Sequence, residues 1–209
     1  MNTEDIQLYL TLSSSHHSHL CPRQVLGVRI ALAGLVCLGL EPQRKDKRLL
    51  VTAETDGCFI DGLAAVTGAS AGHRTLRVED YGKIAATFVD VKTEQAVRVA
   101  PQPDIREKSW RYAPGETRHY FAQLAAYRVM PTHELLNIEE VALVKPIASI
   151  ISQMGARVVC SSCGEEIFND RQVYHAGAPF CLSCAGASYY RKIQDKLTRA
   201  LAEPGPPHR

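Results

Sequence analysis

The longest apolar stretch of the chain covers residues 25–40 and contains a single charged residue, Arg29. Pro22 precedes it at a position that suits the first turn of a helix, and Gly39 stands where helices commonly end. Because apolar residues occupy nearly every side of this segment, the pattern predicts a helix over residues 22–40 at the centre of a domain. The stretch is 16 residues long, which is shorter than the ~20 apolar residues of a membrane-spanning helix.

Shorter patterns predict the remaining elements of this domain. Alternating or continuous apolar runs favour strands over residues 49–52, 75–78, 83–91, 95–100 and 138–144. Residues 92–94 provide a turn, so 83–91 and 95–100 are expected to form a β-hairpin. Helical spacing favours two further helices over residues 58–67 and 116–130. Residues 101–115 are rich in proline and charge and are expected to be partly loop.

Composition places the chain among folded globular proteins. It has 209 residues, of which 45% are hydrophobic and 22% charged, which allows one ordinary domain and a small appendage. We expect a domain over residues 1–155, a module over 156–203 and a disordered tail over 204–209. The first 12 residues contain no basic residue, so a secretory signal is not expected and the protein is predicted to be cytoplasmic.

Four of the 7 cysteines form two C-x-x-C pairs, Cys160/Cys163 and Cys181/Cys184, separated by 17 residues. Two residues between thiolates let both sulfur atoms point to one side of a tight turn. Two such turns supply four sulfurs at tetrahedral corners, about 2.3 Å from a metal ion. The spacing therefore predicts a structural Zn²⁺ site. A redox pair would not explain two pairs at this separation, and the cysteine run of a ferredoxin-type cluster is absent.

The residues around these pairs predict the shape of the module. Strand-like runs at 166–168 and 172–175 flank a polar turn at 169–170, and Gly164 suits the left-handed backbone that follows a cysteine turn. A helical run is expected from Cys184 to residue 201. A cysteine turn, a hairpin, a second cysteine turn and a helix make a treble clef. His175 is predicted to pack on its neighbours, because four cysteines already complete the site.

The charge balance bears on nucleic-acid binding, which many zinc modules perform. Residues 160–209 carry 6 basic and 5 acidic side chains, and the whole chain has a net charge of +2. A nucleic-acid module commonly shows a denser basic face, and the near-neutral total provides no strong field toward anionic lipid. The sequence therefore disfavours nucleic acid and membrane partners, and favours a docking surface for a protein.

A second group of metal-binding residue types lies near the N-terminus. His16, His17 and His19 precede Cys21, which falls at the start of the buried helix, and Cys58 starts the next helix. Helix starts stabilise negative charge and lower the pKa of a thiol, while thiolate and imidazole suit zinc and related transition metals. The pattern predicts a cleft with a metal or a reactive thiol. The alternative, that these cysteines are small buried hydrophobes, stays open; Cys37, within the apolar helix, is predicted to be buried and inert.

Several motifs together resemble the FmdE family, which is named after an accessory component of formylmethanofuran dehydrogenase. Residues 17–22 read HSHLCP and are similar to the family signature H-G-H-x-C-P. The resemblance, which covers roughly residues 15 to 100, continues through the motifs LGVR at 26–29, ETDGCFID at 54–61, TG at 67–68 and YGKIA at 81–85. The four-cysteine tail resembles the treble clef that some members append. Ser18 and Arg23 replace two glycines of the family pattern.

The resemblance implies an α+β fold, in which a mixed β-sheet is flanked by helices in a thioredoxin-like layout. It also implies a homodimer, a cleft that holds zinc in some members, and partner subunits of a molybdenum or tungsten enzyme. Carried over residue by residue, the implied metal ligands are His17, His19, Cys21 and Cys58. Asp61 and Lys83 lie near them in the family pattern.

Three functions follow as hypotheses. The first is a zinc-binding accessory protein whose N-terminal cleft holds a second Zn²⁺ or another transition metal. The second is a small metal- or thiolate-dependent enzyme with a catalytic group of Cys21, Cys58, Asp61 and Lys83. In it Cys21 is nucleophile or ligand, Asp61 the acid or base, and Lys83 the stabiliser of a developing anion. The third is a zinc-finger nucleic-acid-binding protein. No iron–sulfur or dinucleotide motif is present, so redox chemistry on a formyl group is expected to need partner subunits.

Overall fold

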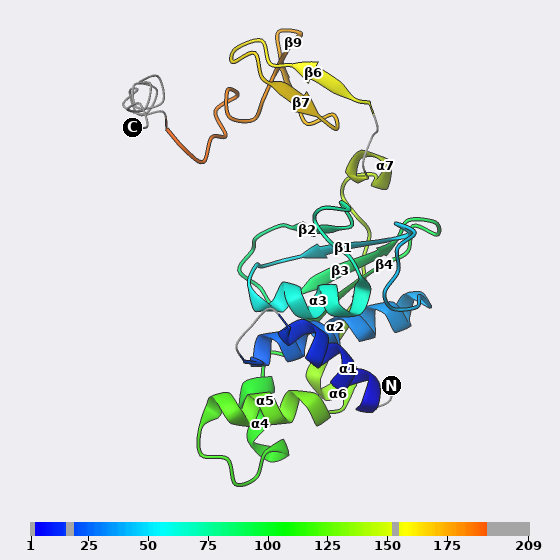
Figure 1. Ribbon diagram of the computed structural model, residues 1–209, viewed down its shortest axis with the longest axis vertical. Helices are drawn as coiled ribbons and strands as arrows, with labels where there is room; N and C mark the ends of the chain where they lie inside the picture. The colour runs from blue at the N-terminus through cyan, green and yellow to red at the C-terminus, as the bar shows by residue number, and fades with distance from the viewer. Residues whose placement is uncertain (1–2, 16–18, 152–154, 192–209) are drawn as a thin grey trace, which may run out of the picture. The chain divides into compact units, whose positions relative to one another are not determined.

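The computed structural model describes residues 3–15, 19–151 and 155–191, and the chain divides into two compact units (Figure 1). The N-terminal unit is Met1–Ile151 and the C-terminal unit is Ser152–Arg209. The domain boundary after residue 155 and the tail from residue 204 remain proposals, since residues 152–154 and 192–209 lie outside the described part.

A mixed five-stranded sheet forms the centre of the N-terminal unit. Its strands, in spatial order, are β2 (Leu76–Val78), β1 (Leu49–Ala53), β3 (Ala86–Asp90), β4 (Ala96–Pro101) and β5 (Leu136–Glu140). β1 and β2 are parallel, and the other neighbouring pairs are antiparallel. The predicted hairpin is confirmed as β3 and β4, in which Phe88 lies opposite Val97.

Helices cover both faces of this sheet, but unequally. The longer ones are α1 (Thr3–Ser14), α2 (Pro22–Leu38), α3 (Cys58–Thr67), α4 (Ile105–Tyr112) and α5 (His119–Val129). Two single-turn helices follow, α6 (Thr132–Leu135) and α7 (Ile147–Ile150). In Figure 1, α2 and α3 lie against one face of the sheet with α1 beyond them, and α7 lies on the opposite side. The α+β fold with a mixed sheet flanked by helices is therefore confirmed.

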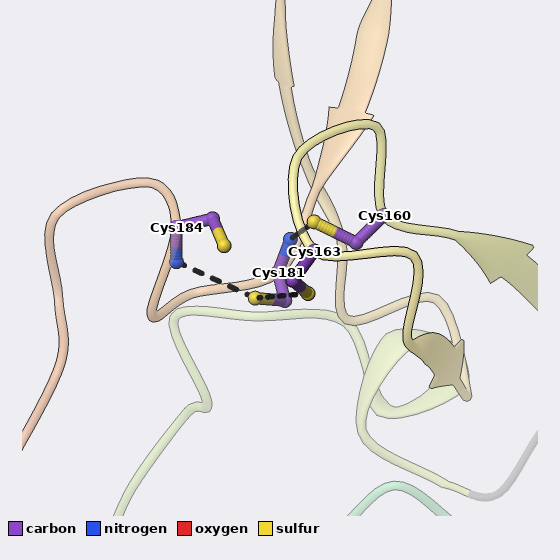
Figure 2. Close-up of side chains that lie close together, drawn as sticks. All are labelled: Cys160, Cys163, Cys181 and Cys184. Atoms are coloured by element: carbon purple, nitrogen blue, oxygen red, sulfur yellow. Dashed lines mark hydrogen bonds between the residues drawn. The ribbon is translucent and has the colours of Figure 1, made fainter. Parts of the chain in front are cut away.

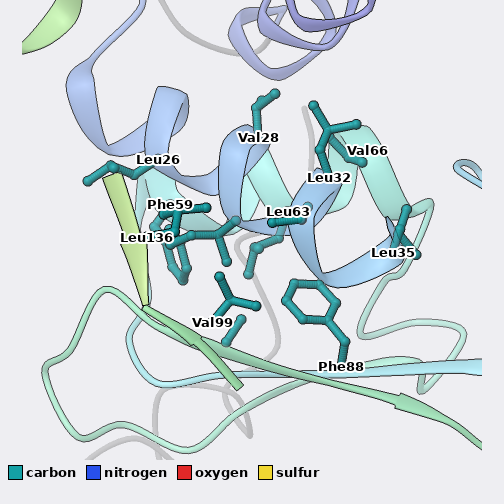
Figure 3. Close-up of a cluster of buried hydrophobic side chains, with 14 of the residues drawn as sticks. Leu26, Val28, Leu32, Leu35, Phe59, Leu63, Val66, Phe88, Val99 and Leu136 are labelled. Carbon is teal, nitrogen blue, oxygen red and sulfur yellow. The ribbon is translucent and has the colours of Figure 1, made fainter. Parts of the chain in front are cut away.

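The alternation along each strand divides the apolar residues between the two faces. Leu49 and Val51 of β1 and Phe88 of β3 join the main core, where Figure 3 shows Phe88 among side chains of α2 and α3. Leu50 and Val89 point to the other face, where Ile147 and Ile150 of α7 pack against them. Period-two alternation thus gives each face its own apolar cluster.

The structure corrects several expectations about these elements. Cys37 is exposed, because it lies with Val36, which is 72% exposed, on the side of α2 that faces away from the core, whereas Leu35 and Leu38 are buried. Helices α1 and α4 were not predicted, because they contain many polar and charged residues and few apolar residues at helical spacing. The expected strand 138–144 begins earlier, at Leu136, and ends at Glu140. Residues 141 and 143 still pack on the second cluster, which explains their apolar character.

Helix α2 is a buried core helix, as its pattern predicted. It has 17 residues, and 14 of them are buried. Among the described residues, no helix combines the length and the apolar character that crossing a bilayer would require.

Candidate functional site

The C-terminal unit is built from two short hairpins. β6 (Arg157–Val159) pairs with β7 (Glu166–Phe168), and β8 (Val173–His175) pairs with β9 (Ala178–Phe180), both antiparallel. The predicted strand runs are therefore present, but the expected pairing of 166–168 with 172–175 is wrong. Strand β7 instead pairs with the preceding strand β6, across the first cysteine turn. Strand β8 pairs with the following strand β9, across the turn at Ala176 and Gly177. Positive φ angles of 49° and 81° at these two residues suit a two-residue hairpin turn.

The two hairpins bring the four cysteines together. Cys160 and Cys163 lie in the turn between β6 and β7, and Cys181 and Cys184 follow β9. Their sulfur atoms all lie within 4.8 Å of one another, and those of Cys163 and Cys181 are 4.0 Å apart (Figure 2). Four thiolates around one zinc ion place neighbouring sulfurs about 3.8 Å apart, given a Zn–S distance near 2.3 Å. The donor set and its spacing therefore fit Zn²⁺.

Backbone N–H groups donate hydrogen bonds to the cysteine sulfurs and so favour the thiolate form that binds a metal ion. The N–H of Cys181 donates to Sγ of Cys160 at 3.3 Å, and the N–H of Cys184 donates to Sγ of Cys181 at 3.4 Å. Hydrogen bonds from the backbone of Cys163 and of Cys181 lower the pKa of the Cys160 thiol to about 6. At Cys163, a hydrogen bond from the N–H of Glu165 lowers the pKa of the thiol. Burial and the neighbouring thiols outweigh this bond and raise the pKa of Cys163 to about 12. Close thiols resist joint ionisation, and a bound divalent cation removes that conflict.

The left-handed backbone expected at Gly164 is confirmed, with φ of 73° and its N–H donating to the carbonyl of Cys160 at 3.0 Å. His175 packs edge-on against Phe180, with ring centroids 5.7 Å apart, and is not part of the cysteine cluster. The helical run expected from Cys184 is absent over residues 187–191. Its remainder, to residue 201, lies outside the described residues, so the treble clef stays a prediction.

In the N-terminal unit, two cysteines meet at two helix starts. Cys21 is the residue that precedes α2, with an extended backbone (φ −120°, ψ 158°), and Cys58 is the first residue of α3. The Cys58 thiol lies close enough to contribute to the raised pKa of the Cys21 thiol. Burial raises the pKa of the Cys21 thiol despite the N–H of Gln24 that donates to it. The expected lowering by the helix start is therefore wrong, because desolvation outweighs it.

The close crossing of α2 and α3 brings these helix starts together. A methyl group added at Gly62 of α3 would lie 2.4 Å from the carbonyl oxygen of Gln24. One added at Gly27 of α2 would lie 2.3 Å from the carbonyl oxygen of Phe59. The two backbones touch at these glycines, where any side chain would separate them.

Gln24 fixes the chain that enters α2. Its Oε1 accepts the N–H of Cys21 at 2.8 Å, and its Nε2 donates to the carbonyl of Ser13, at the end of α1, at 2.9 Å. The side chain is fully buried. Sequence reasoning missed Gln24, although a Gln three residues after a helix-capping residue is the signal of a capping box.

Tyr120 of α5 lies beside the thiol pair. Its hydroxyl donates to the carbonyl of Leu20 at 3.3 Å. Burial raises the pKa of Tyr120, and the nearby Cys21 and Cys58 thiols raise it further. The opposite end of α5 is held by the buried Arg29, whose guanidinium donates at 2.8 Å to the carbonyls of Tyr127 and Met130. No sequence motif pointed to Tyr120, since only the packing of α5 on α2 brings it there.

A pocket of about 730 Å³ opens beside Cys21. Its charged lining residues are Arg23, Lys83, Arg98 and Arg106. Its main apolar and aromatic lining residues are Leu26, Ile84, Ala85, Ile105, Tyr120 and Tyr127. Arg98 is held by the buried carboxylate of Glu54 through two hydrogen bonds, 2.6 Å from Nε to Oε1 and 2.8 Å from Nη2 to Oε2.

The structure brings together only part of the predicted N-terminal site. Lys83 lines the pocket with Cys21, whereas Asp61, in the first turn of α3, is not among its described lining residues. His19 lines a neighbouring pocket with Tyr120. His17 and His16 lie outside the described residues. Within the described residues, His19, Cys21 and Cys58 do not form a group of three ligands comparable to the C-terminal cysteines.

Two family models match the chain. The model described as FmdE, molybdenum formylmethanofuran dehydrogenase operon, matches residues 16–145, which is more than half of the chain. The model of the prokaryotic dksA/traR C4-type zinc finger matches residues 155–190 and so includes all four clustered cysteines.

Two individual proteins are also similar. The first is an FmdE-like protein of the tungsten formylmethanofuran dehydrogenase type from Syntrophus aciditrophicus, with a TM-score of 0.56 and 21% identity. The match covers 89% of this chain and 95% of that one, and shows a common fold. The second is a probable S-adenosyl-L-methionine-binding protein of Archaeoglobus fulgidus, 33% identical over 93 residues, or 43% of this chain. The match spans 25% of that relative's length.

Proposed function

Because the chain belongs to the FmdE family, we propose that it is a zinc-binding accessory protein of a molybdenum or tungsten enzyme. In this proposal the C-terminal zinc finger holds a structural ion through Cys160, Cys163, Cys181 and Cys184. A second transition-metal ion, zinc in the simplest case, binds in the N-terminal unit at Cys21 and Cys58. The finger then serves as a docking surface for a protein partner.

The observation that carries the second site is the meeting of Cys21 and Cys58. They are 37 positions apart in sequence (58 minus 21), yet the Cys58 thiol lies close enough to help raise the pKa of the Cys21 thiol. Three features hold them there: the glycine contact of α2 and α3, the hydrogen bonds of Gln24, and Tyr120 alongside. Supporting groups that fix the orientation of metal ligands are characteristic of functional sites.

Histidine supplies the remaining ligands in this proposal. His19 precedes Cys21 by two residues, and His17 by four. Two thiolates and one or two imidazoles make a donor set suited to zinc, and three protein ligands would leave a position open for exchange. The placement of His17 and His19 on the metal is part of the proposal.

Metal analysis of the purified protein tests this arrangement. We expect about two zinc ions per chain, of which one is lost in the Cys21→Ser/Cys58→Ser double variant and the other in Cys160→Ser/Cys163→Ser. Cys37→Ser is the matched control, because Cys37 is exposed on α2 and distant in sequence from both groups. A content near one zinc ion per chain, unchanged in the Cys21/Cys58 variant, would contradict the second site.

A thiol-dependent enzyme is the second candidate, since Cys21 and Lys83 line one pocket. Cys21 would attack an electrophilic carbon and Lys83 would stabilise the anion that develops. Alkylation by iodoacetamide at neutral pH tests this, with exposed Cys37 as the reference thiol. If Cys21 reacts no faster than Cys37, activation of Cys21 as a nucleophile is excluded.

The name of the Archaeoglobus relative raises S-adenosyl-L-methionine as a ligand. The lining of the pocket does not favour it. Arg23, Lys83 and Arg106 would face a molecule whose sulfonium and ammonium groups outnumber its single carboxylate, and like charges repel. We keep metal binding as the proposed function of this region, because the thiolates of Cys21 and Cys58 would supply the negative charge that a metal ion needs.

The partners of the proposal are a second copy of the chain and subunits of the molybdenum or tungsten enzyme. Light scattering tests the homodimer: the mass should be about twice the 23.0 kDa of one chain. A mass of one chain across micromolar concentrations would contradict it.

A further inference from the structure

We propose that the pocket beside Cys21 binds a small organic anion, one that carries carboxylate or phosphate groups on an apolar body. The inference goes beyond metal binding, because it needs the pocket and its charges but not an ion on Cys21 and Cys58. It rests on the size of the pocket, on its uncompensated positive charge and on its apolar wall.

The size of the pocket suits an organic molecule. Its volume of about 730 Å³ lies within the range of roughly 300–1,000 Å³ that small-molecule sites commonly occupy. Another cavity, lined by Arg44, Lys45 and Lys47, has about 160 Å³. In that smaller cavity Arg44 already pairs with Asp46.

The positive charge of the larger pocket is mostly uncompensated. None of its described lining residues is acidic. Arg98 is neutralised by Glu54, but among the described residues the side chains of Arg23, Lys83 and Arg106 have no ion-pair partner within 4.0 Å. Three exposed cations that line one pocket, with no described carboxylate in its wall, favour an anionic occupant.

Helix α2 adds to this field. Arg23 lies in its first turn, where the helix dipole is positive, and that turn contains no acidic residue. The pair of Arg98 and Glu54 fixes the sheet side of the pocket through its two short hydrogen bonds.

The apolar wall explains why a bare inorganic ion is not the best occupant. Leu26, Ile84 and Ile105 line the pocket together with the ring of Tyr127, which is 1% exposed. A ligand gains from covering this wall only if it carries an apolar part. The chemistry is therefore an oxyanion group joined to a hydrocarbon or aromatic body.

Fluorescence of 8-anilinonaphthalene-1-sulfonate, an anion on an aromatic body, measures this binding in the full-length protein. The Arg23→Gln/Lys83→Gln/Arg106→Gln variant should bind the probe at least about tenfold more weakly, because three partly exposed charge contacts are lost. Lys45→Gln/Lys47→Gln/Lys92→Gln removes the same charge outside the pocket and should stay within about twofold. Equal affinity of the pocket variant and the wild type would overturn the proposal, as would an equal loss in the control variant.

Displacement of the probe identifies the anionic group. Hexanoate, hexyl phosphate and hexanol share one apolar body and differ in the head group. Displacement by hexanoate alone assigns a carboxylate ligand, and displacement by hexyl phosphate alone assigns a phosphate ligand. Displacement by both anions supports the general proposal. Failure of both anions, or equal displacement by hexanol, contradicts it.

Zinc content measured on the same samples separates this proposal from the metal site. The Arg23/Lys83/Arg106 variant should retain the zinc content of the wild type. Unchanged probe affinity in that variant refutes the anion pocket and leaves the metal proposal standing. Unchanged zinc content in the Cys21→Ser/Cys58→Ser variant refutes the second metal site and leaves the anion pocket standing.

Discussion

The two cysteine groups of this protein are assembled in opposite ways. In the C-terminal unit, Cys160 and Cys163 lie in one turn. The backbone N–H groups of Cys181 and Cys184 donate hydrogen bonds to sulfur atoms of the cluster. In the N-terminal unit, Cys21 and Cys58 come from two helices and meet only because α2 and α3 cross at Gly27 and Gly62. The first group depends on local turns and on its metal, and the second depends on the packing of a whole domain.

This difference decides what each group needs in order to form. A small unit with short hairpins buries little apolar surface, so bound metal supplies much of its folding free energy. The N-terminal unit has an extensive apolar core, so its thiol pair should persist without metal. Four changes to the protein or its solution test this contrast, from the largest expected effect to the smallest.

Loss of one zinc ligand should unfold the C-terminal unit alone. Cys160 is the most buried of the four cysteines, at 2% exposed, and structural zinc contributes roughly 10–16 kcal/mol to such a unit. In Cys160→Ser, hydrogen exchange should lose its protection over residues 155–191 and keep it over residues 19–151. Retained protection over 155–191 in a zinc-free sample would show that the unit folds without metal.

Gly62→Ala should destabilise the N-terminal unit and separate its thiols. The added methyl group would lie 2.4 Å from the carbonyl oxygen of Gln24, and overpacking of this kind costs about 3 kcal/mol. Urea unfolding of the variant measures the loss. Gly72→Ala is the matched control, because its methyl group would meet only Oγ of Ser70, at 4.0 Å. Equal stability of the two variants would contradict the close helix contact.

Gln24→Leu should cost about 2 kcal/mol, because the N–H of Cys21 and the carbonyl of Ser13 lose their partner in a buried setting. Zinc content of the C-terminal unit should not change. Thermal unfolding followed by circular dichroism measures the effect. The exposed Gln7 of α1 provides the control, since Gln7→Leu should change stability by at most about 0.5 kcal/mol. If Gln24→Leu and Gln7→Leu unfold at the same temperature, the hydrogen bonds of Gln24 do not stabilise the start of α2.

Acid should weaken the N-terminal unit through Asp90. The guanidinium of Arg48 holds the pKa of this carboxyl well below its usual range, and the N–H of Lys92 adds to the effect. Because the pKa of Asp90 is lower in the folded state, its ionised carboxylate stabilises the fold at a pH above the unfolded-state pKa of ~3.9. This contribution is lost as the pH falls below that value toward the folded-state pKa. Asp90→Asn should lose roughly 1–2 kcal/mol at pH 7, allowing for screening at the partly exposed Arg48.

Urea unfolding at pH 7, 4 and 3 measures this contribution. The difference between wild type and Asp90→Asn should shrink as pH falls below about 4. A constant difference across this range would show that the ion pair with Arg48 does not stabilise the fold. Asp46→Asn, at an exposed pair, should have the smaller effect.

The sequence predicted best where structure is local. The spacing of Cys160, Cys163, Cys181 and Cys184 defines a cluster within one short segment, and the apolar run of α2 defines a buried helix. The sequence was a poorer guide where a segment contacts residues that are distant from it along the chain. Strand runs 166–168 and 172–175 were correctly placed but incorrectly paired, because pairing depends on turns that short strands do not specify.

Tertiary packing explains the other differences. Cys37 lies in an apolar run, yet it stands on the side of α2 that faces away from the core, and it is exposed although Leu38 is buried. The pKa of Cys21 was expected to fall at a helix start, but the surrounding domain desolvates the thiol. Tyr120 lies beside the thiols because α5 packs on α2, where Arg29 donates hydrogen bonds to the C-terminal end of α5. None of these outcomes can be deduced from residue spacing.

The glycine contact between α2 and α3 also has an evolutionary consequence. Where two helices meet through side chains, each change of side-chain volume alters the distance between their axes. At Gly27 and Gly62 the backbones themselves touch, so the spacing of the helix starts is independent of the volumes of neighbouring core residues. Residues such as Leu26 and Leu63 can therefore drift in size among descendants of this protein, while the separation of Cys21 and Cys58 stays the same.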